Sequence, residues 1–292
     1  MNITGVTIVR NAVLNDYPVV ESIRSVLPVV NQMIVSVGDS DDETENLIRG
    51  IGSEKIRIVR STWDLSIRSG GNVLAVETNK VLQQVPDEAD WILYVQADEV
   101  IHEKYHEAIR RAAQKYKNNK KVDGLLFKYL HFYATYDYVG DSRKWYDCET
   151  RLIKNDRTIT SFKDAQGFRR NGEKIRVVPI DAWVYHYGWV KSPQQMKQKQ
   201  KNVNRFWNDD GEAYDAYMAS SDEFDFSDFD SLKKFDGTHP SPMKERIANK
   251  NWKVELNIAR KKLTTKDALL YWLEKLTGKR LFAFRNHTIV KA

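Results

Sequence analysis

The chain of 292 residues is 41% hydrophobic and 29% charged, a balance typical of folded globular proteins and unlike that of disordered ones. No apolar stretch approaches the roughly 20 residues that a membrane-spanning helix needs. The first residues lack the basic and apolar segments of a signal peptide, and the single cysteine, Cys148, excludes an internal disulfide. These features favour a cytoplasmic protein.

The net charge of +6 is concentrated near the C-terminus. Residues 244–292 carry 13 Lys or Arg and 4 Asp or Glu, a balance of +9, whereas residues 1–243 carry 33 and 36, a balance of −3. Such a tail is either a solvated helical face, which is the commoner case, or a surface for anionic lipid, nucleic acid or an acidic partner. The tail contains no recognised nucleic-acid-binding module, so we expect no nucleic-acid partner.

The first part of the chain alternates between strands and helices. Strands are predicted at 3–9, 32–37 and 56–59, and helices at 18–27, 43–49 and 73–85. This alternation indicates a mostly parallel sheet with helices on its faces. A polar loop with paired glycines, residues 61–72, precedes the third helix.

The apolar run Trp91–Val95 is predicted to be the central strand, and it ends abruptly in Gln96, Asp98 and Glu99. In open α/β sheets, ligands bind just beyond the carboxyl ends of the strands. Gln96 and Asp98 lie on the same side if the chain stays extended. The carboxylate could hold a divalent cation, and the cation could hold phosphates. The alternative is an ordinary polar turn.

The remainder of the chain divides at about residue 195. Before it we expect a helix at 103–117 and strands at 124–129, 151–154 and 175–179; after it come a basic helix at 193–207, an acidic Phe-rich loop at 209–230 and a helical pattern in the last 50 residues. The sequence therefore predicts an α/β domain over 1–195 and a mainly helical extension over 196–292.

Several stretches, in this order, resemble the family-2 inverting glycosyltransferases with a GT-A fold. The stretches are Thr7–Asn11, Gly38–Thr44, Asn79 ahead of Ala89–Leu93, Gln96–Glu99 at the D-x-D position, and His186–Trp189. The closest pattern is a bacterial subset that has this Gln in the motif. The resemblance covers roughly residues 3–195 and implies a GT-A sheet. It also implies transfer of a sugar from a nucleotide-diphospho-sugar donor to a glycan or lipid-linked acceptor, as in polysaccharide biosynthesis.

The resemblance also implies site residues. Residues on the nucleotide-sugar side are Val9, Asn11, Asp39, Asp41, Gln96 and Asp98, and the metal ligands for Mn²⁺ or Mg²⁺ are Asp98 and His186. Arg68 and Asn72 join the donor side because their loop precedes the central motif and a guanidinium fork suits phosphate; a solvated loop is the alternative. Gln96 is a weaker ligand for a hard cation than the Asp it replaces, so metal binding depends on Asp98 and the substrate phosphates, or is lost.

Inverting transfer needs one carboxylate that takes the proton of the acceptor hydroxyl. In this family that acid lies in a loop after the central strand, and both Asp164 and Glu149 fit in sequence order. We prefer Asp164 because Gly167-Phe168 after it resembles the corresponding loop.

Two other functions are compatible with parts of the sequence. A sugar nucleotidyltransferase of similar fold usually has a glycine-rich loop after its first strand, and Arg10–Val13 contains no glycine. A nucleic-acid-binding protein would use the basic tail. The same tail could instead contact the membrane that carries a lipid-linked acceptor, which would place the protein at the inner face of the membrane. The lysines at 197, 199 and 201 are interpreted as a helix face rather than as a phosphate clamp.

Overall fold

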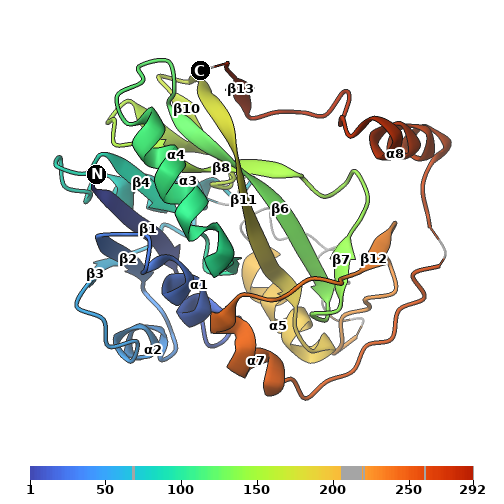
Figure 1. The fold of residues 1–292 in the computed structure, drawn as a ribbon. Helices are drawn as coiled ribbons and strands as arrows, with labels where there is room; N and C mark the ends of the chain where they lie inside the picture. Colours follow the sequence, from blue (N-terminus) through green and yellow to red (C-terminus); the bar gives the residue numbers. More distant parts are fainter. Residues whose placement is uncertain (68–69, 205–218, 220, 260, 292) are drawn as a thin grey trace.

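The computed structural model describes residues 1–67, 70–204, 219, 221–259 and 261–291. A large curled sheet of mixed strand direction forms its centre, in the order β3-β2-β1-β4-β8-β6-β11-β10-β9 (Figure 1). The strands are β1 Ile3–Val9, β2 Gln32–Gly38, β3 Ile56–Ser61, β4 Trp91–Tyr94, β5 Glu99–Ile101, β6 Gly124–Ala134, β7 Tyr138–Gly140, β8 Cys148–Lys154, β9 Ile159–Phe162, β10 Gly167–Arg170, β11 Glu173–Val190, β12 Leu232–Lys234 and β13 His287–Ile289. The helices are α1 Val19–Val26, α2 Thr44–Arg49, α3 Asn72–Leu82, α4 His106–Tyr116, α5 Pro193–Val203, α7 Lys244–Ala248 and α8 Thr265–Thr277, with single 3-10 turns at Glu103–Tyr105 and Ser241–Met243.

The parallel sheet predicted for the first half is confirmed over β1 to β4. β1 pairs in parallel with β2 on one side and β4 on the other, and β2 pairs in parallel with β3. The carboxyl ends of these strands therefore meet at one edge of the sheet. Val9, at the end of β1, and Gln96, just after β4, lie at this edge.

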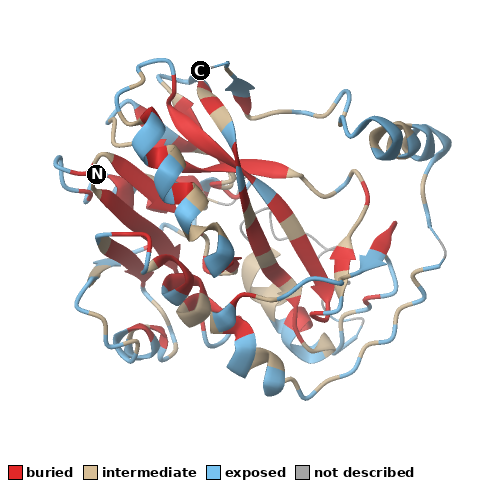
Figure 2. Cartoon of the chain, in the orientation of Figure 1, coloured by how far each residue is buried: buried red, intermediate tan, exposed pale blue. Residues whose placement is uncertain are grey.

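The strands β1 and β4 are buried on both faces, which explains their nearly continuous apolar sequences. Alternate side chains point to opposite sides. Ile3 and Leu93 belong to the core beneath α1 and α4, whereas Val6 and Ile92 belong to the core beneath α3. The two cores appear as the red interior of the ribbon in Figure 2.

The expectation of a mostly parallel sheet is wrong for the second half. β8 pairs antiparallel with β4 and with β6, and β9, β10 and β11 form an antiparallel succession. Parallel neighbours need a long crossover, usually a helix. The segments that join β9, β10 and β11 contain no helix, so these consecutive strands run in opposite directions.

The longest strands, β6 and β11, pair in parallel from Val177 opposite Gly124 to Val190 opposite Ala134. The sequence predicted only a short strand at 175–179; Pro179, which lacks a backbone donor, is the kind of residue found at bulges in a strand. The register shifts between Pro179 and Trp183, so an irregularity accommodates the proline and the strand continues. This continuation carries His186 and Gly188 to the edge where β4 ends.

In the last 50 residues, the part that the structure describes is less helical than predicted. Residues 249–257 form no helix, and the apolar side chains of Trp252, Val254, Leu256 and Ile258 alternate and pack onto other elements. A period of two suits an extended segment and not a helix. β13 then pairs in parallel with the start of β11, so the C-terminus returns to the main sheet (Figure 1). The domain boundary at 195 stays a prediction.

The acidic Phe-rich stretch is only partly described, because residues 209–218 and 220 lie outside the described residues. In the part that is described, Phe226 is buried, and Phe224 and Phe229 pack beside it against the aromatic cluster at the far ends of β6 and β11. Within the described residues, none of the helices has the length and apolarity needed to cross a bilayer.

Candidate functional site

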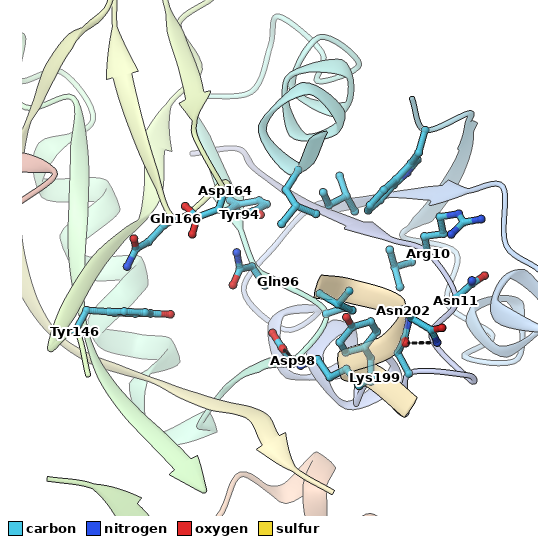
Figure 3. Close-up of a pocket in the computed structure, with 18 residues that line it drawn as sticks. Arg10, Asn11, Tyr94, Gln96, Asp98, Tyr146, Asp164, Gln166, Lys199 and Asn202 are labelled. Atoms are coloured by element: carbon cyan, nitrogen blue, oxygen red, sulfur yellow. Dashed lines mark hydrogen bonds and ion pairs between the residues drawn. The ribbon is translucent and has the colours of Figure 1, made fainter. Parts of the chain in front are cut away.

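A cavity of about 250 Å³ lies at the edge where β1 and β4 end. Most of its walls come from the end of β1 and the residues after it, the end of β4 and the residues after it, the turn between β9 and β10, and α5; single side chains from the loop after β3, from α3 and from the segment before β8 complete them. The lining residues are Ile8, Val9, Arg10, Asn11, Asn15, Tyr17, Trp63, Leu74, Tyr94, Gln96, Ala97, Asp98, Tyr146, Asp164, Gln166, Lys199, Asn202 and Val203. In Figure 3, Gln96 lies between Asp164 on one side and Asp98 with Lys199 on the other.

The cavity brings together part of the predicted site: Val9, Asn11, Gln96, Asp98 and Asp164. His186 does not line it but lies directly behind Asp98. Asn72 is an exposed first residue of α3 and lines no part of the cavity. Arg68 lies outside the described residues, so its predicted role is not examined by the structure.

Asp39 and Asp41 lie beside the cavity, in the loop after β2, and hold its rim. Asp41 Oδ2 is 3.2 Å from Nη2 of Arg10 and accepts from the side-chain amide of Asn11, also at 3.2 Å. Asp39 Oδ1 is 3.4 Å from Nε of Arg10. Asn11 has a left-handed φ of 55°, a conformation that Asn tolerates better than most residues. Its backbone N–H donates to Ser40 Oγ at 3.0 Å, so the loops after β1 and β2 are clasped together.

Asp98 is surrounded by positive charge. Its Oδ2 is 3.5 Å from Nζ of Lys199 and 3.6 Å from Nε2 of His186. Burial alone would raise the pKa of Asp98, but the charges of His186, Lys199 and Lys191 outweigh burial and hold it well below its usual range. Asp98 is therefore a carboxylate at any ordinary pH.

The side chains at this end do not form a metal site built by the protein. Asp98 and His186 supply two candidate ligands, and Gln96 offers an amide in place of a carboxylate. In the described part of the chain, no group of three or more His, Cys, Asp or Glu side chains is placed to hold a metal ion. The ammonium of Lys199 faces the same Oδ2 that a cation would use. The expected Mn²⁺ or Mg²⁺ would have to take most of its ligands from a bound substrate.

The opposite end of the cavity carries Asp164 and Gln166, in the turn between β9 and β10. Lys163 and Ala165, on either side of Asp164, both have left-handed φ values, 55° and 58°, so the turn is tight. Behind it lies Glu149, a buried residue of β8 whose Oε1 accepts from Nδ2 of Asn286 at 3.3 Å. Its other oxygen, Oε2, has no hydrogen-bond partner among the described residues.

Glu149 has an unusual ionisation. Burial raises its pKa to about 7, and the negative charge of Asp164 adds to this, while the charge of Arg151 opposes it. A carboxyl group with this pKa exchanges protons near neutral pH. Glu149 lies behind Asp164, the residue that we preferred as general base from the sequence, and Glu149 was the second candidate.

A buried ion pair supports both ends of the cavity. Arg151 donates to both oxygens of Glu99, Nε to Oε2 at 2.8 Å and Nη2 to Oε1 at 2.7 Å, and neither side chain is exposed. Glu99 Oε2 also accepts from the backbone N–H of Gln96 at 3.1 Å, and Arg151 Nη1 donates to the carbonyl of Gln166 at 3.0 Å. The pair therefore fixes the turn after β4 against the turn that carries Asp164.

Sequence reasoning missed Lys199 as a lining residue and placed it on a solvated helix face. The spacing of apolar residues in α5 held the missing signal. Met196, which is buried, and Val203, which lines the cavity, lie three residues before and four residues after Lys199, so the three share the inward face of the helix.

No protein-family model matches the chain, and no curated protein matches it. Three resemblances to solved structures are distant. Glucosyl-3-phosphoglycerate synthase from Mycobacterium tuberculosis, in complex with Mn²⁺, uridine diphosphate and phosphoglyceric acid, is 18% identical with a TM-score of 0.31, over 44% of this chain and 43% of that one. S. aureus TarS is 15% identical with a TM-score of 0.37, over 75% and 42%. The 4-diphosphocytidyl-2C-methyl-D-erythritol synthase from Anaerococcus prevotii is 11% identical with a TM-score of 0.34, over 53% and 70%. The chain thus spans less than half the length of the first two structures, and TM-scores below 0.5 establish neither a shared fold nor a shared activity.

Proposed function

We propose that this chain is an inverting glycosyltransferase of the family-2 type, which moves a sugar from a nucleotide-diphospho-sugar to a glycan or lipid-linked acceptor. One observation carries the proposal: a single cavity at the carboxyl ends of parallel strands holds a cation-rich end at Asp98 and a carboxylate end at Asp164. A diphosphate needs positive charge, and an acceptor hydroxyl needs a base. Both requirements are met within one cavity, at the edge where α/β sheets bind ligands.

The donor would lie with its base and ribose toward Val9, Asn11 and the clasp formed by Asp39 and Asp41, and with its diphosphate toward Asp98. Gln96, between the two ends, would contact the transferred sugar or the phosphate beside it. The roles of Arg68 and Asn72 stay predictions. An Mn²⁺ or Mg²⁺ ion at Asp98 and His186 is one source of positive charge at this end.

In the reaction, the acceptor oxygen attacks the anomeric carbon from the face opposite the diphosphate. The carbon–oxygen bond to the acceptor forms as the bond to the phosphate oxygen breaks, and the bonding electrons leave with the nucleoside diphosphate. The acceptor proton passes to the carboxylate of Asp164. General-base catalysis of this kind typically contributes a hundredfold to ten-thousandfold in rate.

The first experiment identifies the donor by thermal shift with UDP-, GDP-, dTDP- and CMP-sugars, and with nucleoside triphosphates. A ligand that binds only the folded state adds about 2.7 kcal/mol at a hundredfold excess over its dissociation constant. Stabilisation by a nucleotide sugar is expected. Stabilisation by a triphosphate alone would favour the nucleotidyltransferase alternative, and no stabilisation by any nucleotide would contradict the proposal.

The second experiment separates the two ends with Asp98→Asn and Asp164→Asn. Asp98→Asn should weaken donor binding and slow transfer, whereas Asp164→Asn should keep donor affinity and lower turnover about a hundredfold or more. Asp181→Asn, a largely exposed carboxylate paired with Lys128, is the matched control and should change neither. Near-native turnover of Asp164→Asn would transfer the role of base to Glu149.

We also propose peripheral contact with an anionic membrane through α8. Leu269, Trp272 and Leu276 are 59%, 57% and 67% exposed and recur on one side of the helix. The opposite side is attached to the body, because Glu274 pairs with Arg143 at 2.6 Å and Lys275 with Asp141 at 2.7 Å. α8 itself carries two Lys and two acidic residues, so the positive charge comes from the rest of residues 244–292, which have a balance of +9. Exposed aromatic and apolar residues combined with basic charge favour anionic interfaces.

Liposome flotation tests the membrane contact. Anionic vesicles should retain the protein better than neutral ones, and Trp272→Ser should weaken this retention without a loss of folding, because the side chain is exposed. Equal retention by both kinds of vesicle would contradict the contact.

A further inference from the structure

The cation-rich end of the cavity is formed by a lysine in the place where a divalent cation is expected. We propose that the ammonium group of Lys199, supported by Lys191, binds the diphosphate of the donor, so that nucleotide binding by this chain needs no divalent metal. This inference rests on the proposed function, and it assigns to Lys199 of α5 the phosphate-binding role that the sequence analysis set aside in favour of a helix face.

Lys199 is held in a defined position. Its Nζ donates to the carbonyl of Gly188 at 2.8 Å and is 3.5 Å from Oδ2 of Asp98. The side chain lines the cavity and is 14% exposed. An ammonium group has three donors, and these contacts take two of them. The third has no hydrogen-bond partner among the described residues, where its other close neighbour is the Tyr17 ring, 5.0 Å from Nζ to the centroid; it can therefore serve a ligand oxygen that enters the cavity.

Gly188 makes this arrangement sterically possible. A Cβ atom at position 188 would lie 2.6 Å from Oδ2 of Asp98 and 2.8 Å from Nε2 of His186. Any other residue would therefore push these two side chains away from the point where Lys199 meets the end of β4. The glycine supplies both the space and the carbonyl that accepts from Lys199.

Lys191 adds a second buried amine behind Lys199. Its side chain has no exposed surface, and its Nζ donates to the carbonyl of Asp16 and lies 4.0 Å from a carboxylate oxygen of the same residue. Burial lowers the pKa of Lys191 to about 7, and the charge of Lys199 lowers it further against the opposing charge of Asp16. Only Lys199 lines the cavity, so an anion would contact Lys199 and lessen its repulsion with the buried amine of Lys191, whereas another cation would add to it.

A metal ion at the same point would meet unfavourable neighbours. It would share Oδ2 of Asp98 with His186 and lie within a few ångströms of the ammonium of Lys199, a like charge. The amide of Gln96 offers little compensation, because hard divalent cations prefer carboxylate oxygens. The charge that a metal would bring to the diphosphate is already supplied by α5.

The test is isothermal titration of UDP, with GDP in parallel, into the full chain in buffer with EDTA and in buffer with MnCl₂. The wild-type affinity for the diphosphate that binds should be the same in both buffers within about twofold. Lys199→Ala should lower it about tenfold or more in both, because a charge-assisted hydrogen bond is lost. Lys199→Arg, which keeps the charge, should retain more of the affinity than Lys199→Ala.

Lys121→Ala is the matched control, because it removes the same charge from an exposed turn and should bind like the wild type. Melting curves establish that each variant is folded. Wild-type binding that disappears in EDTA and returns with MnCl₂ would overturn the role of Lys199 and favour a metal at Asp98 and His186. Unchanged affinity of folded Lys199→Ala would also overturn it. Absence of UDP and GDP binding in both buffers would contradict the proposed function itself.

Discussion

Each end of the cavity has an acidic side chain largely removed from solvent, and the surroundings of Asp98 and Glu149 shift their pKa values in opposite directions. Asp98 is adjacent to His186 and Lys199, and its pKa lies well below the usual range. Glu149, behind Asp164, is buried away from water and lies near the negative charge of Asp164, and both raise its pKa, to about 7. Neighbouring charge dominates at the first end and loss of solvent at the second.

This difference bears directly on function. A carboxylate that never protonates can hold a cation in place while an anion binds beside it. A carboxyl group that titrates near neutral pH can exchange protons with a neighbour such as Asp164. Under the proposed function, the end at Asp98 would serve the leaving diphosphate, and the end at Glu149 and Asp164 would serve the proton of the acceptor.

The largest effect is expected from breaking the ion pair that joins the two ends. Arg151→Met should destabilise the fold by about 3–5 kcal/mol, because it leaves Glu99 charged and buried without its partner. Urea unfolding measures this loss. Arg49→Met, which removes an exposed helical pair with Glu45, should cost less than about 1 kcal/mol. A loss at position 151 as small as that of the control would show that the pair does not hold the ends together.

An intermediate effect is expected at the end of the cavity near Asp164, where the pKa of Glu149 is raised from 4.5 to about 7. The raised pKa means that the stability contributed by protonated Glu149 is complete below about pH 4.5 and lost as the pH rises through about 7. Glu149→Gln should therefore gain stability relative to the wild type over this window. The gain should reach about 3 kcal/mol, at about 1.4 kcal/mol per pH unit.

Urea unfolding of both proteins between pH 4 and pH 8 measures this difference, and Glu88→Gln, an exposed substitution, supplies a flat control. A stability difference between Glu149→Gln and wild type that does not change with pH would show that Glu149 ionises like an exposed glutamate. The contrast between the two ends would then be lost.

The smallest effect is expected from Gly188→Ala at the cation-rich end. The added methyl group displaces the tips of Asp98 and His186 without removing a charge, so the fold should persist while affinity for a nucleoside diphosphate falls about tenfold. Gly50→Ala is the matched control, since its Cβ would meet atoms no closer than 3.4 Å. Titration calorimetry compares the two, and equal affinities would mean that the packing at Gly188 is not needed for binding.

The cavity residues at the edge of the sheet could be predicted from the sequence. The residues that α5 contributes to the opposite wall of the cavity could not. Val9, Asn11, Gln96 and Asp98 follow apolar strands, and the carboxyl ends of parallel strands meet at one edge whatever the rest of the chain does. Lys199 reaches this edge only because α5 packs across it. From the sequence alone, a lysine in a basic helix is expected to face solvent, because the elements against which the helix packs are not known.

The same limit applies to the second half of the fold. The sequence predicted only a short strand at 175–179, but a register shift opposite β6 lets β11 continue past Pro179 to Val190. The apolar residues between Trp252 and Ile258 suggested a helix, yet their alternate spacing packs an extended segment against the aromatic clusters. Pairing partners that lie far apart in the sequence decided both outcomes, and local patterns do not contain them.

The most direct measurement of the central claim is a crystal structure of the chain with the nucleotide sugar that gives the largest thermal shift, grown in EDTA. The account predicts a diphosphate in contact with Nζ of Lys199 beside Asp98, the base toward Asn11, and the anomeric carbon facing Asp164. A nucleotide bound elsewhere, such as the shallow hollow between Asp39 and Arg60, would contradict it. An anomeric carbon directed away from Asp164 would contradict the assignment of the base.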